Sequence, residues 1–534
     1  MQRGIPSEWG AARARWAQLQ GALFGMVLLL FIFAPQGAWA ASEAAVARVI
    51  ADAAHLSLNI GPRPAGSAAE AEAARWVRGS LLTFGWSPRT IGRDTNIVAC
   101  RGAGQRLFLA HIDSVPNSPG LIDNAAGVAI LMEIARSSDA PDLCLGFPDA
   151  EERGLLGSAR MAEGWAGDPA ALELVVALDL VGQGTLGQMG LGKGWSDARL
   201  RWVHGLTQGR LRAPVVHRLY SRLLPHMERS DHAPFAARGA PSMLLFGMGE
   251  GEVFPRYHQP SDSPAVAPSP LDPEAIAETL DALLALSRAP PPPAPGPADT
   301  GLALQLGPVL LPGELLLGML SLCGLSGIWA LRRGGVAALQ GAAWSLLGTA
   351  GLGLSGLALS WGLFDVLLPI LAGVGLRIAP AEAERTAAAV MGMPASGWWA
   401  LAPAFSALLL LQWLLVRRAL RARVRGAEPA ALLGAGFAGL ACGLDPLLGA
   451  IFAAAALAAR LHPALGAAPA VLLLRPDALR QLSFHGLVPP MAWGLALALA
   501  GLGLGARLRL GGGAEPPGPR GPSPSAADPQ APRG

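Results

Sequence analysis

The hydrophobic pattern of this chain changes at about residue 290. Before that point short apolar runs alternate with polar segments, whereas long apolar runs fill roughly residues 301–510. Short apolar runs with polar flanks are typical of buried strands. We therefore expect strands within 86–100, most clearly at 96–100, and at 107–110, 143–147, 172–180 and 242–246.

Between these runs, apolar residues recur at helical spacing. In the segment that follows Asp123, Val128, Leu131, Met132 and Ile134 would share one face of a helix. Further helices are expected at 43–60, 68–84, 152–161, 195–207 and 271–287. Strands that alternate with helices indicate an α/β domain with a doubly wound, mixed sheet.

The apolar half of the chain predicts an all-α polytopic membrane domain at 302–508, with about six to eight crossings. Clear spans are expected at 311–331, 338–359, 398–416 and 491–506, and shorter apolar runs lie at 364–376, 430–444, 447–459 and 464–474. Asp365 and Asp445 lie in apolar runs, and acids inside a membrane are candidates for a functional role. The pair Asp445-Pro446 would also suit the turn of a helical hairpin, and Asp365 would suit the end of a span at the membrane interface.

Residues 1–40 have the features of a signal peptide or an N-terminal anchor. Arginines precede an apolar run at 21–34, and an Ala-x-Ala cleavage pattern ends at Ala40, which favours a signal peptide. Both interpretations place the following domain outside the cytoplasm, on the periplasmic face of a multi-pass inner-membrane protein. The other expected segments are an outer domain at 41–288, a proline-rich linker at 289–301 and a disordered tail at 509–534.

The composition of the chain limits the kinds of molecule that it is expected to contact. The net charge of +3 is too weak to indicate a nucleic-acid partner, and a hydrophobic fraction of 52% makes membrane lipid the expected surroundings. Cys100 and Cys144 each fall in an expected strand. They would form a disulfide in an oxidising compartment or remain two buried thiols, and the sequence leaves both alternatives open. No CxxC spacing supports a cysteine zinc site.

Acidic and histidine side chains follow the expected strands. Because sites in open α/β sheets form at the carboxyl ends of the strands, these side chains would converge at one edge. Converging carboxylates would repel one another and raise one another's pKa, and a pair of divalent cations removes that cost. Carboxylate and imidazole ligands suit zinc above all. The residues are His111, Asp113, Asp123, Glu151, Glu152, Asp179 and His258.

These residues belong to a set of motifs that resembles the M28 family of zinc aminopeptidases. The motifs are GPRPAGS, HIDS, LIDNAAGVA, EERGLLGS, LDLVG, SDHAPF and YHQPSD, in this order across about residues 55–288. The layout, with a peptidase domain before membrane spans, is similar to that of the ER-type M28 proteins. The resemblance implies the sheet of the zinc aminopeptidases, two zinc ions per domain and removal of N-terminal residues from peptides.

Carried over residue by residue, the resemblance implies a ligand set. His111 and Asp179 would bind one zinc ion, and Glu152 and His258 would bind the other. Asp123 would bridge the two ions. A water between two such ions has a pKa close to neutrality, which would supply the nucleophile at ordinary pH.

The resemblance also implies roles for residues that do not bind metal. Glu151 would act as general base and then as general acid, tethered beside a ligand yet free of the metals. Asp113 would accept a hydrogen bond from the far nitrogen of His111. The peptide bond between Asp123 and Asn124 would be cis. Asp231 and His232, in an expected loop beside the site, are weaker candidates for a direct role.

The resulting hypothesis is a membrane-tethered aminopeptidase that acts on peptides with a free N-terminus. A glutaminyl-cyclase-like acyltransferase shares the fold, but that chemistry uses one zinc ion, so a complete two-metal ligand set argues against it. A non-catalytic binding module on a transporter or scaffold is the remaining alternative. Relatives of the fold that lose catalysis generally lose ligands, and here every ligand position is filled.

Overall fold

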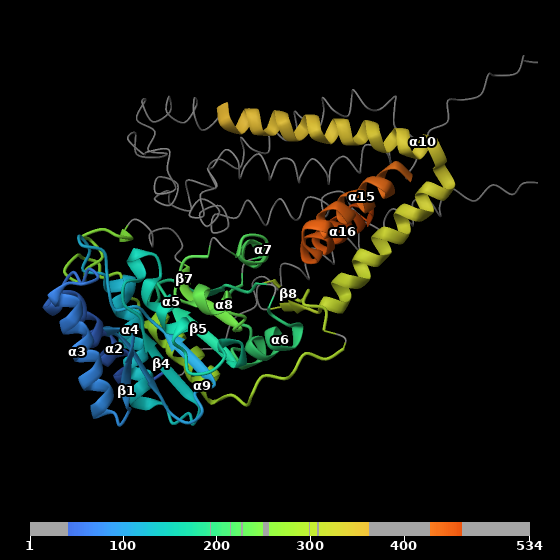
Figure 1. The fold of residues 1–534 in the computed structure, drawn as a ribbon. Helices are drawn as coiled ribbons and strands as arrows, with labels where there is room; N and C mark the ends of the chain where they lie inside the picture. Colours follow the sequence, from blue (N-terminus) through green and yellow to red (C-terminus); the bar gives the residue numbers. More distant parts are fainter. Residues whose placement is uncertain are drawn as a thin grey trace, which may run out of the picture.

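The computed structural model of the chain describes two parts, an α/β domain and a group of apolar helices (Figure 1). The described ranges are 41–192, 194–213, 215–225, 228–248, 256–297, 299–306, 309–362 and 428–461. The signal or anchor segment at 1–40, the runs at 364–376, 398–416, 464–474 and 491–506, and the tail at 509–534 lie outside these ranges.

A mixed seven-stranded sheet forms the centre of the α/β domain, in the order β1-β2-β4-β3-β5-β7-β6. The four central strands are parallel, and β1, β2 and β6 run antiparallel to their neighbours. The strands are β1 (Pro88–Ile91), β2 (Arg93–Cys100), β3 (Arg106–Leu109), β4 (Leu143–Phe147), β5 (Leu174–Leu178), β6 (Thr185–Met189) and β7 (Ser242–Met248). Every expected strand is present, whereas β6 was not predicted because its sequence TLGQM contains no apolar run.

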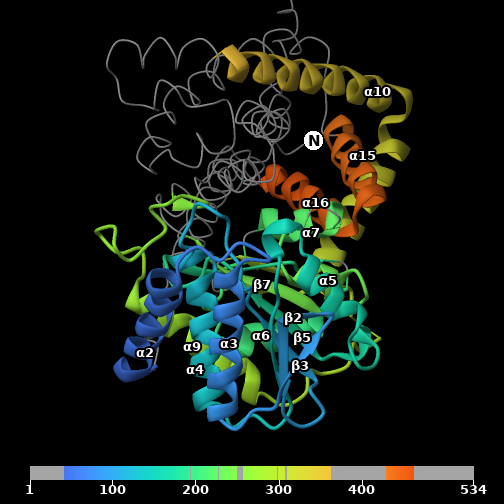
Figure 2. The ribbon, with the colours of Figure 1, turned by 60° about the vertical axis from the view of Figure 1, so that its left-hand side comes forward.

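Helices cover both faces of the sheet, as expected for a doubly wound domain (Figure 2). One face packs against α2, α3, α4, α6 and α9, and the other packs against α5 and α8. The helices are α2 (Glu43–Ala54), α3 (Ala68–Thr83), α4 (Ala126–Ser137), α5 (Leu156–Glu163), α6 (Asp197–Leu206), α7 (Val215–Leu223), α8 (His232–Ala236) and α9 (Pro273–Arg288).

Side-chain caps fix where several of these helices begin. The side chains of Ser42, Ser67, Ser196 and Asp272 accept hydrogen bonds from backbone N–H groups in the first turns of α2, α3, α6 and α9. Each cap satisfies a donor that the helix itself leaves unpaired. The helix starts expected from the sequence therefore agree with the observed starts of α2, α3, α6 and α9 to within about two residues. The expectation was wrong at α8, which occupies the segment expected to be a loop.

A disulfide joins Cys100 to Cys144, which lie opposite each other in the antiparallel pair β2–β4. The alternative of two buried thiols is therefore wrong for this structure. A cross-link between residues that are 44 apart in sequence restricts the unfolded chain. A bond of this kind suits a domain that folds in an oxidising compartment.

Replacing both Cys100 and Cys144 by Ser should lower the free energy of unfolding by about 2–4 kcal/mol, because the unfolded chain regains its freedom. Denaturant titration of the purified protein measures this change. Reduction of the unaltered protein with dithiothreitol serves as the control and should cause a similar loss. An unchanged midpoint under both treatments would contradict the structural role of the disulfide.

The segment after α9 does not lead directly into apolar helices. Residues 289–297 form neither helix nor strand, in keeping with the expected linker. Asp299 then binds the start of α6 by accepting from the backbone N–H groups of Asp197 and Ala198, at 2.8 and 3.0 Å. Two segments that the sequence assigned to the membrane domain instead form paired antiparallel strands, β8 (Leu304–Leu306) and β9 (Val309–Leu311).

The apolar helices of the described part are α10 (Gly313–Gly362), α15 (Glu428–Leu444) and α16 (Pro446–Leu461). Two expected spans are merged into α10, which has non-helical backbone angles at Gly335. Within the described ranges, one helical segment, Gly313–Gln340, is long and apolar enough to cross a membrane, with a mean hydropathy of 1.7. The described part therefore does not show a domain with six to eight crossings.

Candidate metal centre

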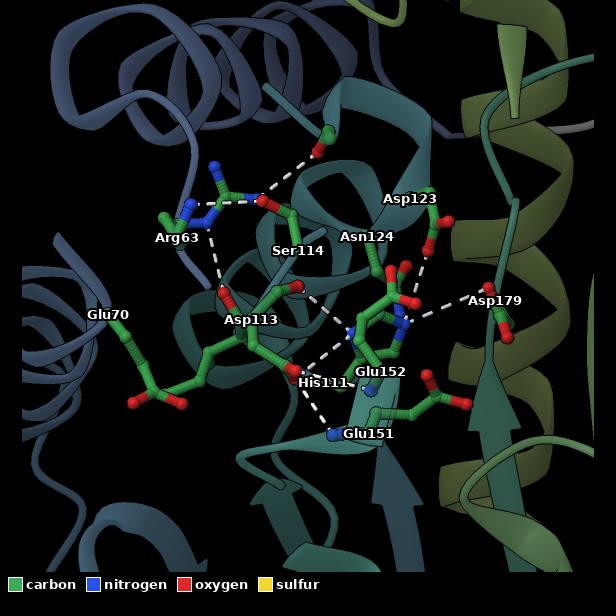
Figure 3. A network of polar contacts seen from close by, with 12 residues as sticks. Arg63, Glu70, His111, Asp113, Ser114, Asp123, Asn124, Glu151, Glu152 and Asp179 are labelled. Atoms are coloured by element: carbon green, nitrogen blue, oxygen red, sulfur yellow. Dashed lines mark hydrogen bonds and ion pairs between the residues drawn. The ribbon is translucent and has the colours of Figure 1, made fainter. Parts of the chain in front are cut away.

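The candidate site lies where the parallel strands β3, β4 and β5 end. His111 follows β3, Glu151 follows β4, and Asp179 follows β5. These strands pair in parallel register, so their carboxyl ends lie at one edge of the sheet. Figure 3 shows the three side chains directed toward the same space. This confirms the expected convergence at the sheet edge.

Two groups of metal-ligating side chains meet at this edge and share Asp123. In the first, His111 Nε2 lies 3.4 Å from Asp123 Oδ1 and 3.9 Å from Asp179 Oδ1. In the second, His258 Nε2 lies 3.0 Å from Glu152 Oε2 and 3.3 Å from Asp123 Oδ2. The ligand atoms of each group lie within 4.8 Å of one another. The two oxygens of Asp123 thus face different groups.

The donor atoms of both groups fit a cation. Buried polar atoms normally have hydrogen-bond partners, yet among the described residues one donor atom of each of these side chains has none. A buried nitrogen or oxygen atom with a free lone pair and no hydrogen bond, set in a cluster of carboxylates, is suited to bind a cation. The atoms are His111 Nε2, Asp123 Oδ2, Glu152 Oε1, Asp179 Oδ1 and His258 Nε2.

The pKa values in the cluster reflect the concentration of negative charge. Burial alone would lower the pKa of His258, but the carboxylates of Asp123 and Glu152 close to its ring raise it to about 10. Burial also opposes a charged His111, and the carboxylates around it, Glu151 first, still hold its pKa well above the usual range. Burial raises the pKa of Glu151 strongly, and Asp179 adds to this shift. A cluster that favours positive charge so strongly suits a cation.

Asp113 supports the site through backbone contacts. Its two carboxylate oxygens accept hydrogen bonds from the backbone N–H groups of Glu151 and Glu152, at 3.0 and 3.2 Å. His111 Nδ1 lies 3.1 Å from the backbone carbonyl oxygen of Asp113 and 3.5 Å from its carboxylate. The expected partner residue of His111 is therefore present, but the hydrogen bond goes to its carbonyl group. The carboxylate instead fixes the turn that carries Glu151 (Figure 3).

The turn that carries Asp123 is held by residues for which no role was predicted from the sequence. Its peptide bond to Asn124 is cis, as the resemblance implies. Asp262 accepts hydrogen bonds from the backbone N–H groups of Ile122 and Asp123, at 2.9 and 3.1 Å. Asn124 Nδ2 donates to the carbonyl of Leu178 at the end of β5, at 2.7 Å. The motif YHQPSD contains Asp262, but only the folded chain brings it to this turn.

Arg63 is the second support that the sequence did not reveal. Its side chain is fully buried and donates to the carbonyl oxygens of Leu56, Gly61, Ile112, Pro119 and Gly120. Burial lowers its pKa to about 10, while nearby aspartates act in the opposite direction, so the guanidinium stays charged at neutral pH. The motif GPRPAGS thus supplies a buried cation that joins the HIDS loop to the turn of Asp123.

Further residues surround the two donor groups. Ser230 Oγ donates to Asp179 Oδ2 at 3.0 Å. Asp231 is fully buried beside the site, and burial raises its pKa to about 7. His258 has a positive φ of 58°, which is uncommon for a residue other than glycine. The ring of Tyr257 stacks on the ring of His258, with centroids 3.7 Å apart.

A cavity of about 410 Å³ opens over the donor groups. Glu151 lines this cavity but belongs to neither donor group. Its lining combines charged and polar side chains, which include Glu228, Arg229 and His232, with larger apolar and aromatic residues that we call the wall. The wall residues are Leu155, Leu180, Met189, Tyr220, Leu244 and Phe246.

Comparisons with known proteins find relatives of the α/β domain. Residues 96–286 match the model of peptidase family M28. Aminopeptidase YwaD of Bacillus subtilis (strain 168) is 34% identical over 170 residues, which cover 29% of this chain and 35% of the relative. The chain thus matches about a third of the length of that curated relative.

Solved structures that align with part of this chain include BSAP, a zinc aminopeptidase from Bacillus subtilis. It is 18% identical, the alignment covers 45% of this chain and 93% of BSAP, and the TM-score is 0.38. The glutaminyl cyclase of Porphyromonas gingivalis is 19% identical, with 45% and 97% of the two chains covered and a TM-score of 0.36. The family match thus covers residues 96–286, which carry most of the seven-stranded sheet and both donor groups.

Proposed function

We propose that this protein is a membrane-tethered, two-zinc aminopeptidase that removes N-terminal residues from peptides. The observation that carries the proposal is Asp123, whose two carboxylate oxygens face two separate donor groups. His111 and Asp179 would complete one zinc site, and Glu152 and His258 would complete the other. Bound there, a pair of zinc ions would lower the pKa of a water molecule and polarise the scissile carbonyl.

Glu151 is the proposed general base. It lines the cavity next to Glu152, and Asp113 holds its backbone in place. Its carboxylate would take a proton from the attacking water and then deliver that proton to the leaving amine, so that the residue ends the cycle in its starting state. Asp231 has no direct part in this scheme. Its buried carboxyl group lies behind the site and contributes to the raised pKa of Glu151.

The shape of the cavity supports exopeptidase activity. The free α-amino group of the substrate, as a neutral amine, would lie beside the donor groups, where its lone pair suits a bound zinc ion. The side chain of the first residue would then contact the apolar wall that includes Met189, Leu244 and Phe246. An apolar wall favours an apolar first residue, because burial of its side chain contributes to binding.

We further propose that the peptidase domain lies on the periplasmic side of the inner membrane. The Cys100–Cys144 disulfide supports an oxidising compartment. The segment Gly313–Gln340 supports a tether, since several of its large apolar side chains are exposed, among them Leu322, Leu325 and Ile328. Multi-pass insertion and a cleaved signal peptide at 1–40 remain part of the proposal.

The glutaminyl-cyclase alternative would need one cation, whereas the chain offers two donor groups that share a ligand. Two complete groups favour hydrolysis assisted by two metal ions. A non-catalytic binding module would not need Glu151, which faces the cavity without belonging to a donor group. These two observations favour the aminopeptidase.

Digestion of a peptide series tests the proposal. The full chain, purified in detergent and loaded with zinc, should bind about two zinc ions and release amino acids one at a time from peptides with a free N-terminus. The same peptides with an acetylated N-terminus serve as the control and should stay intact. Formation of pyroglutamate from N-terminal glutamine without release of amino acids would instead support the cyclase alternative.

A further inference from the structure

We propose that Arg222 and Asp445 form a positioning link, through which the C-terminal apolar helices hold one wall of the cavity in place. The inference rests on the proposed peptidase function for its effect on substrate binding. Arg222 lies on α7 of the α/β domain, and Asp445 lies between α15 and α16. Neither residue belongs to a donor group, and neither lines the cavity.

The contact between the two side chains is close and buried. Arg222 Nε lies 2.9 Å from Asp445 Oδ1 and 3.0 Å from Asp445 Oδ2. The Arg222 side chain is 6% exposed and the Asp445 side chain is not exposed at all. Charged groups are almost never buried to this degree unless they are paired. Each residue therefore accounts for the burial of the other.

Asp445 is also the residue at which the hairpin turns. Helix α15 ends at Leu444 and α16 begins at Pro446. Asp445 Oδ1 accepts a hydrogen bond from the backbone N–H of Leu447 at 2.9 Å and so caps the start of α16. The hairpin alternative for Asp445-Pro446 is therefore confirmed. The same carboxylate then has a second role, because it binds the guanidinium of Arg222.

Apolar packing accompanies the ion pair. Leu219, one turn before Arg222 on α7, packs into a cluster that contains Leu447 and Ile451 of α16. In both ribbon views, α7 lies between the α/β domain and the end of the α15–α16 hairpin (Figures 1 and 2). One face of α7 thus contacts the C-terminal helices through an ion pair and an apolar contact.

The other contacts of α7 reach the cavity. Tyr220 lines the cavity directly. The ring of His217 meets the ring of Phe246, another wall residue, edge to face with centroids 5.5 Å apart. Helix α7 therefore connects the hairpin to the wall that the first residue of a substrate would contact. A shift of α7 would move this wall while leaving the donor groups unchanged.

The segment after the linker contributes a third contact to the link. The carbonyl of Gly301 accepts hydrogen bonds from Arg222 Nη1 and Arg218 Nη2, both at 3.0 Å. Loss of the charge on Asp445 would leave the buried guanidinium of Arg222 with neutral acceptors only and without its described ion-pair partner. Because an unpaired buried cation is strongly unfavourable, α7 would then move so that the guanidinium reaches water.

The variant Asp445→Asn separates the link from the helix cap, since the Asn side chain can still accept from the N–H of Leu447. In the full chain in detergent, this variant should raise KM for short peptides about tenfold, leaving kcat and zinc content nearly unchanged. The matched control is Arg201→Gln, which breaks an exposed pair between α6 and α10 at 4.0 Å, with side chains 48% and 49% exposed. This control should leave KM unchanged.

Hydrogen exchange gives a second measurement that needs no peptidase activity. The amides of α7 should exchange about tenfold faster in Asp445→Asn than in the unaltered chain, with α3 and α9 unaffected. Arg222→Lys keeps the positive charge but loses the planar guanidinium donors, so the amides of α7 should exchange at an intermediate rate. This second variant also tests the link if Asp445→Asn fails to fold. If the unaltered chain shows no peptidase activity, the proposed function is refuted, but the link between Arg222 and Asp445 is not. Unchanged α7 exchange in both link variants would overturn the link.

Discussion

Replacing Glu151 by Gln should lower kcat by about 10²–10⁴-fold while the protein keeps its zinc. The amide has nearly the shape of the carboxyl group but cannot take a proton from water. Because Glu151 belongs to neither donor group, its loss should not release metal. Initial rates on a peptide with a free N-terminus, measured together with zinc content, check both parts of this expectation.

Glu163→Gln is a suitable control for this variant. Glu163 is an exposed glutamate near the end of α5, away from the cavity lining, and its replacement changes the net charge by the same amount. Its kcat should match that of the unaltered protein. Full activity in Glu151→Gln would refute the proposed general base, and loss of zinc in that variant would show that Glu151 is a ligand.

Replacing Arg63 by Met should lower the free energy of unfolding by about 3–5 kcal/mol. The substitution removes a buried cation and leaves several carbonyl oxygens without their donor, which adds a desolvation cost for each of them. It also removes a positive charge that acts on Asp113, Asp123 and Asp262. Chemical denaturation of the disulfide-bonded protein measures the effect.

Arg75→Met controls for the change in residue type. Arg75 is an exposed arginine on α3, so its replacement should change the free energy of unfolding by no more than about 0.5 kcal/mol. We also expect zinc binding to weaken in Arg63→Met, because the guanidinium joins the loop of His111 to the turn of Asp123. Equal stability of the two variants would contradict the structural role given to Arg63.

The sequence placed the candidate site more accurately than it placed the membrane domain. Apolar strand runs followed by His111, Glu151 and Asp179 identify the sheet edge, because parallel strands bring their carboxyl ends together. The C-terminal half offers only apolar runs, and the hydropathy of a run does not show which other segment it packs against. As a result, the segments that form β8 and β9 were assigned to the membrane, although Gln305 of β8 is hydrogen-bonded to Gln188 and to the carbonyl of Leu211 in the α/β domain.

Hydrophobic pattern was also a poor guide to short or polar elements. Strand β6 is an edge strand held by its pairing with β7, and that pairing needs no apolar run. Helix α8 places Phe235 in the core on the α5 side of the sheet, yet it is too short to show a helical period. Both elements form because a neighbour supplies hydrogen bonds or an apolar surface, which a local window cannot detect.

The sequence by itself determined the alternation of strands and helices and the side chains at the carboxyl ends of the strands, since both follow from residue type and spacing. Only the tertiary structure decided that Arg63 and Asp262 support the turn of Asp123, and that Arg222 pairs with Asp445. The members of each of these sets come from separate segments of the chain. Which polar groups meet depends on how buried charges are satisfied, and that is settled when the whole chain packs.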